Sequence, residues 1–299
     1  MHTKPYLTPI TDVKQKIKDY NALIKFTLSI TVVFSSVIAY LLAPSAVFKL
    51  SNVLWLTLGG MLVTSAANAI NQIVEKDTDA LMKRTAKRPV ANGNMSEGEA
   101  WMFTFIAATA GTIILGLKFN WAAASVALFS LFLYAFVYTP LKKVNSIAVL
   151  VGAIPGALPC LIGWVAGAGS FTTGGWVLFA IQFLWQFPHF WAIAWVAHKD
   201  YTSAGFKLLP SASGPTKFTA YQALSYAVIM IPFGFLPYFI EPRMSGVVSL
   251  IILLLANLYM VAMCVRLVKN MDVKAARRVM FSSYIYLPVI LLALLIDKI

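Results

Sequence analysis

Of the 299 residues, 60% are hydrophobic and only 12% are charged, and the formal net charge is +13. Soluble domains carry about a quarter charged residues, so this composition excludes an ordinary soluble protein and indicates a membrane protein. The excess of basic residues does not call for a nucleic-acid partner, because it follows the alternating sides of a predicted membrane topology.

Nine apolar stretches are each long enough to cross the hydrocarbon core of a bilayer, which needs about 20 residues of helix. In chain order they are Phe26 to Ala43, Val53 to Ile73, Trp101 to Leu117, Trp121 to Tyr138, Ile147 to Ala168, Trp176 to Ala197, Ala220 to Ile240, Gly246 to Val265 and Val279 to Ile296. They leave no room for a separate soluble domain. We therefore expect one all-α membrane domain over residues 1–299, preceded at 1–25 by a cytoplasmic amphipathic segment that lies at the interface.

Lysine and arginine are concentrated on alternate connections. If the N-terminus is cytoplasmic, twenty fall on the inside, and only Lys49, Lys118, Arg243 and Lys298 fall outside. Because cytoplasmic loops of membrane proteins are enriched in these residues, the pattern predicts a cytoplasmic N-terminus and an external C-terminus.

The inner end of the second span carries a cluster of acids. Glu75, Asp77 and Asp79 are three of only eleven acidic residues in the chain. If the helix continues, Asn71, Glu75 and Asp79 stand at i, i+4 and i+8 and share one face. Oxygen ligands in this arrangement suit Mg²⁺, which binds few carboxylates and keeps water or phosphate as its other ligands.

A basic segment follows directly, with Lys83, Arg84, Lys87 and Arg88. Guanidinium groups bind phosphate oxygens in a bidentate manner, so an acidic face followed by a basic one indicates a site for a Mg²⁺-diphosphate. The alternative is a solvated, salt-bridged loop that obeys the charge rule of membrane topology.

Two other polar groups accompany this segment. Tyr134, Tyr138 and Lys142 again have i, i+4, i+8 spacing and would extend the phosphate pocket; the alternative is interfacial tyrosines and a border lysine. His189 follows a proline in the sixth span, where an imidazole is costly unless it faces the bundle interior or a cavity. Asp200 lies on the same face if that helix persists. An ordinary packed histidine bonded to a neighbour is the alternative for His189.

The run NQIVEKDTDALMKRTAKRP from Asn71 to Pro89 resembles the first motif of the UbiA-type intramembrane prenyltransferases, and closely their haem O synthase branch. Three further stretches resemble the same branch: YTPLKKVNSIAVLVGAIPGALPCLIGW from Tyr138, QFPHFWAIAW from Gln186 and HKDYTSAGFKLLP from His198. The superfamily often has Asp at the position of Glu75, and a further acid where this chain has Ala204. This reduced second motif favours the haem O synthase branch and leaves a second Mg²⁺ position open.

The resemblance implies a nine-helix bundle with a central cavity that opens near the cytoplasmic face of a bacterial inner membrane. It implies transfer of a farnesyl group from farnesyl diphosphate, with Mg²⁺, to a vinyl group of haem B, giving haem O for terminal oxidase assembly. Haem A synthase and oxidase assembly proteins are the expected protein partners. Asn71, Glu75 and Asp79 fall where this family binds Mg²⁺-diphosphate, and Arg84 and Arg88 fall on its phosphate-contacting bases. We further expect Asp200 to act in metal binding and catalysis and His189 to orient or ligate the porphyrin iron. The expected additional substrate-binding residues are Lys83, Tyr138, Lys142 and Lys199.

Two other function classes compete with this interpretation. A UbiA-type enzyme with a quinone or chlorophyll precursor as acceptor would share most of the motifs. A multi-helix transporter would place charged groups near the membrane midplane, whereas the charges here stop at the inner ends of the spans.

Overall fold

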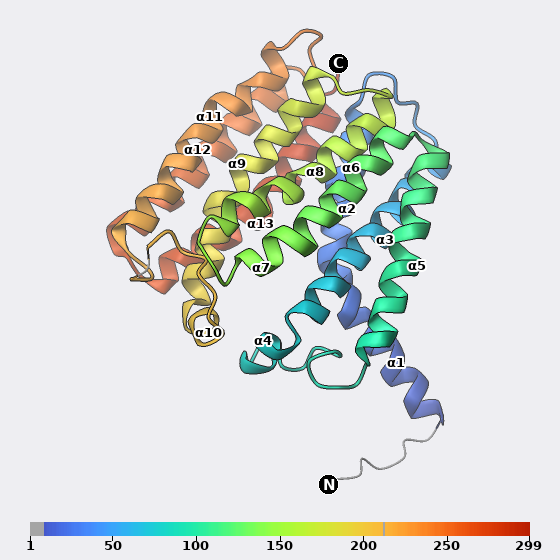
Figure 1. Ribbon diagram of the computed structural model, residues 1–299. Coiled ribbons are helices and arrows are strands. Elements are labelled where there is room, and N and C mark those ends of the chain that lie inside the picture. The colour runs from blue at the N-terminus through green and yellow to red at the C-terminus, as the bar shows by residue number, and fades with distance from the viewer. Residues whose placement is uncertain (1–8, 212) are drawn as a thin grey trace.

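The computed structural model describes residues 9–211 and 213–299, and these residues form an all-helical bundle (Figure 1) with one isolated bridge between Ser245 and Lys298. The first eight residues of the predicted N-terminal segment lie outside the described part. The elements are α1 (Pro9–Ile24), α2 (Phe26–Leu42), α3 (Leu50–Val74), α4 (Lys76–Leu81), α5 (Glu97–Lys118), α6 (Trp121–Phe132), the π-helix η1 (Leu133–Tyr138), α7 (Thr139–Leu141), α8 (Ala148–Ala168), α9 (Thr173–Val196), α10 (His198–Ser203), α11 (Lys217–Phe239), α12 (Val247–Asn270) and α13 (Val273–Ile296).

The predicted spans correspond to helices of the bundle. Eight segments in the described part are long and apolar enough to cross a membrane, and α2 becomes a ninth when it is taken together with α1, from which it is bent by 46°. The fourth span runs without interruption through α6, η1 and α7, from Trp121 to Leu141. The prediction of an all-α membrane protein is therefore confirmed, with boundaries that differ by a few residues.

Local sequence explains where several helices begin. Ser96, Asn120 and Asp272 are N-cap residues whose side chains accept hydrogen bonds from backbone N–H groups in the first turns of α5, α6 and α13. Each satisfies a donor that the helix itself leaves unpaired. At the other end of α8, Gly169 adopts a φ of 76°, the left-handed conformation that commonly terminates a helix.

The spans pack in pairs that are often distant in sequence. α3 lies against α5, α2 against α8, and α9 against α8, α11 and α13. Two glutamine side chains of α9 form hydrogen bonds to the backbone of α8 within the apolar core. Gln182 Nε2 donates to the Gly156 carbonyl and Gln186 Nε2 donates to the Ala153 carbonyl, each at 2.9 Å. Such interhelical bonds and close contacts supplement van der Waals packing in a membrane, where lipid is as apolar as the core.

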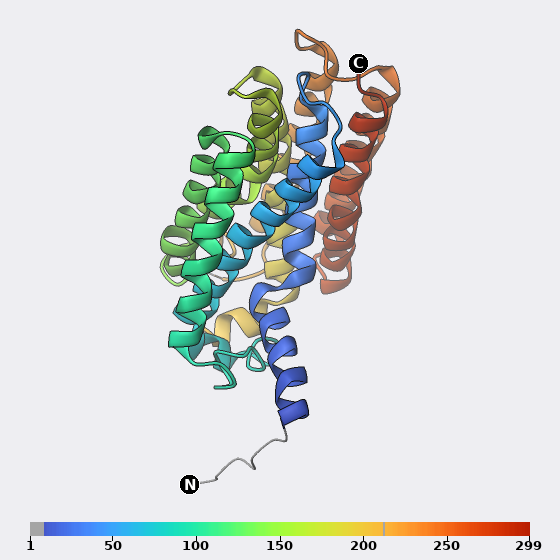
Figure 2. The same cartoon turned by 90° about the vertical axis from the view of Figure 1, so that its right-hand side faces the viewer.

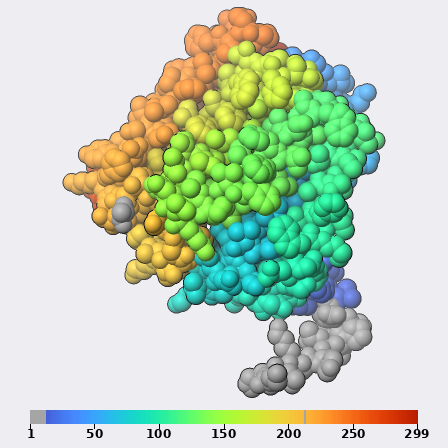
Figure 3. All heavy atoms as spheres, in the orientation of Figure 1, coloured from blue at the N-terminus to red at the C-terminus, as the bar shows by residue number. Residues whose placement is uncertain are grey.

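The short helices α4 and α10 lie at the end of the bundle from which the chain enters, while the C-terminus lies at the opposite end (Figures 1 and 2). The loops around them meet. Met82 packs with Ala204 and Phe206, and the Lys207 N–H donates to the Lys142 carbonyl at 2.7 Å. In the space-filling view the cyan, green and yellow segments adjoin at this end of the molecule (Figure 3).

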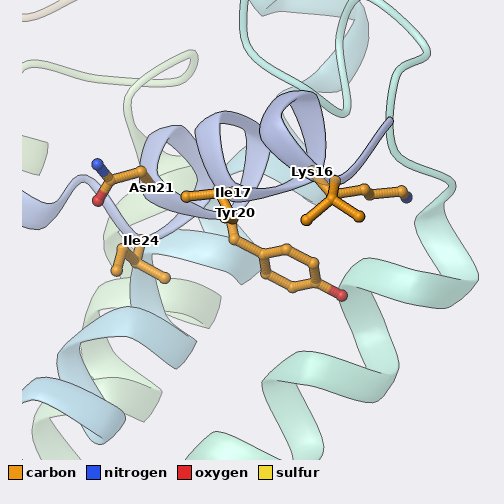
Figure 4. A pocket seen from close by; sticks show the side chains of 6 residues that line it. Lys16, Ile17, Tyr20, Asn21 and Ile24 are labelled. Atoms are coloured by element: carbon orange, nitrogen blue, oxygen red, sulfur yellow. The ribbon is translucent and has the colours of Figure 1, made fainter. Parts of the chain in front are cut away.

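The predicted amphipathic helix is present as α1. Val13, Ile17, Tyr20 and Ile24, spaced along one side of this helix, line one surface hollow of about 470 Å³. Figure 4 labels Ile17, Tyr20 and Ile24 among the side chains that line it. Val13 and Ile17 remain exposed, as expected for a helix whose apolar face would meet an interface.

Candidate active site

The predicted metal ligands share one face at the end of α3. The α-helix stops at Val74, so the assumption of an uninterrupted helix is wrong, but the helical bonding continues across the break. The Glu75 N–H donates to the Asn71 carbonyl at 3.0 Å, and the Asp79 N–H donates to the Glu75 carbonyl at 2.7 Å. Asn71, Glu75 and Asp79 are all buried, whereas Asp77 is exposed. The i, i+4, i+8 face is thus preserved and points into the protein.

Bases from three other segments hold these side chains. Lys142 Nζ lies 2.5 Å from Glu75 Oε1, and Arg88 Nη1 donates to both carboxylate oxygens of Asp79 at 2.8 and 2.6 Å. Lys25 Nζ donates to Asn71 Oδ1 at 3.0 Å, and Asn71 Nδ2 donates to Glu75 Oε2 at 2.7 Å. Three basic side chains therefore lie around two carboxylates and an amide.

Burial shifts the ionisation of this cluster. The pKa of Asp79 is raised because the carboxyl is desolvated, and the neighbouring Arg88 opposes that shift. The pKa of Lys142 is lowered for the same reason, and Glu75 opposes the shift. Desolvation destabilises the charged form of a buried group, and a nearby opposite charge stabilises that form. The two members of each ion pair therefore stabilise one another, and a buried member without its partner would lower the stability of the folded protein.

Aromatic rings enclose the basic side of the cluster. The Lys142 ammonium lies 4.9 Å from the centre of the Tyr138 ring and 5.3 Å from that of Phe206. Tyr138 belongs to η1, and π-helical turns occur frequently at functional sites. The Arg84 guanidinium lies 5.8 Å from the ring centre of Tyr201 in α10. Rings and cations in this geometry attract each other, although Arg84, unlike Lys142, remains exposed.

Lys83, Lys199 and Asp200 are not drawn into the cluster. Lys83 and Lys199 are exposed, and they have no ion pair among the described residues. Asp200 is half-buried in α10, and no group of three His, Cys, Asp or Glu side chains in residues 9–211 and 213–299 is close enough to bind a metal. Its role in metal binding stays a prediction.

The assumption that α9 persists to Asp200 is wrong. The helix ends at Val196, and Ala197, with φ −95° and ψ 17°, separates it from α10. His189 lies within α9, buried between Trp185 and α13, and its Nδ1 is 2.7 Å from Ser283 Oγ. As at Glu75, helical bonding continues across the break, since the Ala197 N–H donates to the Ile193 carbonyl at 2.9 Å and the Tyr201 N–H to the Ala197 carbonyl at 3.0 Å. Asp200 nevertheless lies on a separate helix, α10, and no contact joins it to His189 among the described residues.

Sequence reasoning missed several members of the site. It counted Lys25 only as a topology charge, and it gave no role to Thr139, Tyr201 or Phe206. Asn71 Nδ2 contacts Thr139 Oγ1 at 3.4 Å. A signal was present for Tyr201 and Phe206, which lie in the motif stretch that begins at His198. Two surface hollows, along α1 and at the opposite end of the bundle, contain none of the clustered acids or bases.

Comparison with known proteins agrees with this architecture. Residues 32–286 match the model of the UbiA prenyltransferase family. A protoheme IX farnesyltransferase of Cytophaga hutchinsonii is 45% identical over 94% of this chain and 97% of its own length. The mitochondrial protoheme IX farnesyltransferase of Arabidopsis thaliana is 34% identical over 94% of this chain and 65% of its own length.

Solved structures share the fold at low sequence identity. A structure of digeranylgeranylglyceryl phosphate synthase superposes with a TM-score of 0.78 at 21% identity, covering 95% of this chain and 98% of that one. A UbiA homologue from Archaeoglobus fulgidus bound to GPP and Mg²⁺ gives 0.70 at 14% identity, covering 92% and 99%. With a family model that spans most of its length and relatives of this similarity, the chain belongs to the UbiA prenyltransferase family, and it is a membrane-embedded prenyltransferase.

Proposed function

We propose that the protein transfers the farnesyl group of farnesyl diphosphate to a vinyl group of haem B and so makes haem O for terminal oxidase assembly. The observation that carries the proposal is the buried cluster in which Lys25, Arg88 and Lys142 lie around Asn71, Glu75 and Asp79. Three basic side chains accompany two acidic ones, and a bound diphosphate would favour the protonated form of each base. The names of the full-length relatives support farnesyl and protoheme IX as the two substrates.

The donor set suits Mg²⁺. Two carboxylates and one amide oxygen, from Glu75, Asp79 and Asn71, lie on one face, and a hard cation that keeps water or phosphate as further ligands needs few protein oxygens. When bound, Mg²⁺ would neutralise charge on the departing diphosphate. The solved homologue with GPP and Mg²⁺ supports a divalent metal here.

In the structure the bases are paired with the acids. Binding of a metal and a diphosphate would replace these pairs, with the acids binding the metal and the bases binding the phosphate oxygens. Arg88 would leave Asp79 for phosphate oxygens, and Lys142 would leave Glu75. Arg84, an exposed residue whose guanidinium lies near the Tyr201 ring, would add a further guanidinium. Charge-assisted bonds of this kind stabilise the leaving group more strongly in a water-poor site than in bulk solvent. Lys83 and Lys199 would act at the exposed edge of the site, and Asp200 would contribute a further carboxylate to the metal.

The orientation in the membrane follows from the charge pattern. We place the N-terminus and the α4/α10 end in the cytoplasm of a bacterium, with the C-terminus outside, because the basic loops gather at that end. The hydrophobic product would then remain in the bilayer, where association with haem A synthase or oxidase assembly proteins would pass it on.

Substitution of the buried acids tests the proposed chemistry. Glu75→Gln and Asp79→Asn keep the shape of each side chain but remove its charge, and we expect farnesyl transfer to fall by about 10²-fold or more, the size typical of losing one electrostatic stabiliser of a transition state. Asp77→Asn, an exposed acid of the same cluster, is the matched control and should stay within about twofold.

The substrate pair is tested with purified wild-type protein, haem B, farnesyl diphosphate and Mg²⁺, with mass spectrometry of the haem. Farnesylated haem is the expected product. Folded protein that leaves haem unmodified but prenylates a quinone or chlorophyll precursor would assign it to another acceptor class. Protein that releases no diphosphate with any acceptor would contradict the enzymatic interpretation.

A further inference from the structure

The break between α1 and α2 leaves the end of α1 without backbone partners. α1 ends at Ile24, Lys25 takes a left-handed conformation, and α2 begins at Phe26. The last carbonyl groups of a helix have no partner within that helix. Among the described residues, no backbone N–H beyond the break donates to the carbonyls of Ala22, Leu23 or Ile24. These groups need donors from elsewhere, because an unpaired backbone carbonyl inside a protein is costly.

Two amide side chains of α3 supply these donors. Gln72 Nε2 donates to the Ala22 carbonyl at 2.9 Å and to the Leu23 carbonyl at 2.8 Å. Asn68, which lies one turn earlier on the same face of α3, donates from Nδ2 to the Ile24 carbonyl at 3.2 Å. The end of α1 is thus fixed to α3 by side-chain hydrogen bonds to three consecutive carbonyl groups.

Gln72 keeps one of its own polar atoms unpaired. Its side chain is fully buried, and Oε1 has no hydrogen-bond partner in the described part of the chain. A buried carbonyl oxygen without a donor lowers the stability of the folded protein, and a leucine at this position would avoid that loss. The presence of an amide here is therefore explained by what its Nε2 group binds, which is the end of α1.

The same turn of α3 carries a residue of the candidate active site. Asn71, the residue before Gln72, accepts a hydrogen bond from Lys25 Nζ at 3.0 Å and donates to Glu75 at 2.7 Å. Lys25 directly follows the three carbonyls that Asn68 and Gln72 bind. A left-handed conformation is unfavourable for a residue with a side chain, so the surrounding structure must hold it. The bonds from α3 to the end of α1 provide such support.

We propose that Gln72, assisted by Asn68, is a positioning residue that places the Lys25 ammonium at the diphosphate site. This inference rests on the proposed function. By binding the last carbonyls of α1, the amide fixes the direction in which the chain leaves that helix, and with it the backbone of Lys25. A charge that is in place before the ligand arrives avoids the entropy cost of ordering a long lysine side chain upon binding.

The experiment measures the Kd of a non-hydrolysable farnesyl thiodiphosphate with Mg²⁺ by calorimetry of the purified full chain. Gln72→Leu keeps the approximate size of the side chain but removes both donated bonds. We expect its Kd to rise by about 10-fold, the lower end of the loss for one charge-assisted hydrogen bond. In a Lys25→Met background, where the ammonium is gone, the same substitution should change the Kd by less than about twofold.

Gln182→Leu is the matched control. Gln182 is also buried, and its amide donates to the backbone of a neighbouring helix, so the substitution removes a comparable bond. Because Gln182 has no contact with the end of α1 among the described residues, the Kd of Gln182→Leu should equal that of the wild type.

Comparison of the two backgrounds separates positioning from general damage to the fold. An unchanged Kd in Gln72→Leu overturns the inference, and so does an equal loss in the wild-type and Lys25→Met backgrounds, which would indicate a structural role alone. If Gln72→Leu does not fold, as judged by thermal unfolding in detergent, Asn68→Ala is read in the same way, with an expected loss of about 2- to 10-fold for one neutral hydrogen bond. Wild-type protein that does not bind the thiodiphosphate would refute the proposed function together with the inference.

Discussion

Lys25 holds an unusual backbone conformation at the edge of the active site. Its φ of 48° and ψ of 57° are left-handed, a conformation that costs a residue with a side chain about 1–2 kcal/mol. The α1–α2 bend lies at this residue, and the Lys25 ammonium donates to Asn71 Oδ1. Strain of this kind persists at functional sites where the surrounding structure fixes it.

Lys25→Met should weaken binding of the diphosphate substrate. The change retains most of the aliphatic stem but removes the charge, and the loss of one charge-assisted hydrogen bond corresponds to about 1.5–3 kcal/mol, or roughly 10- to 100-fold in Kd. Calorimetry with a non-hydrolysable farnesyl thiodiphosphate and Mg²⁺ measures it. Lys14→Met, an exposed lysine of α1, should leave the Kd unchanged. If both variants bound the thiodiphosphate with equal affinity, Lys25 would contribute to the membrane topology alone and not to diphosphate binding.

Residues of the site differ in how far sequence alone could identify them. Asn71, Glu75 and Asp79 were predictable because their alignment depends on local helical spacing. Lys25 and Ser283 were not, because their contacts with Asn71 and His189 span 46 and 94 residues and exist only once the helices are packed.

At the scale of elements, two long helices break beside the site. α3 gives way to α4 at Glu75, and α9 gives way to α10 at Ala197. Neither residue is a helix breaker in isolation, so helix propensity does not predict the breaks. The residues that follow the two short helices pack together, Met82 against Ala204 and Phe206.

The contact between α2 and α8 depends on Gly163. A Cβ atom there would lie 1.8 Å from the Ser36 carbonyl oxygen, so Gly163→Ala would force the two helices apart. Small residues allow such close approach in membranes, and we expect a loss of about 1–3 kcal/mol, seen as a lower midpoint of thermal unfolding in detergent. Gly98→Ala, where a Cβ meets nothing within 4 Å, should unfold no earlier than the wild type. A Gly163→Ala midpoint equal to that of Gly98→Ala would contradict the packing argument.

For the molecule as a whole, hydropathy predicts the spans. In a bilayer every backbone N–H and C=O group must be hydrogen-bonded within the protein, so each apolar stretch of sufficient length forms a helix. Hydropathy does not specify which spans become neighbours. The packing of α2 on α8, or of α9 on α13, depends on shape and on a few interhelical bonds, and these do not repeat along the sequence.

The charge pattern predicts the direction of the protein in the membrane. Nine spans would put the two ends of the chain on opposite sides, and α1 and the C-terminus do lie at opposite ends of the bundle (Figure 1). Both native cysteines are buried, so single cysteines introduced at exposed Lys87 and Lys49 would report the two faces. Because basic loops stay in the cytoplasm, an impermeant maleimide added to intact cells should label Lys49→Cys and spare Lys87→Cys, with both labelled after permeabilisation. The reverse pattern would place the α4/α10 end outside and would require farnesyl diphosphate to be supplied from that side.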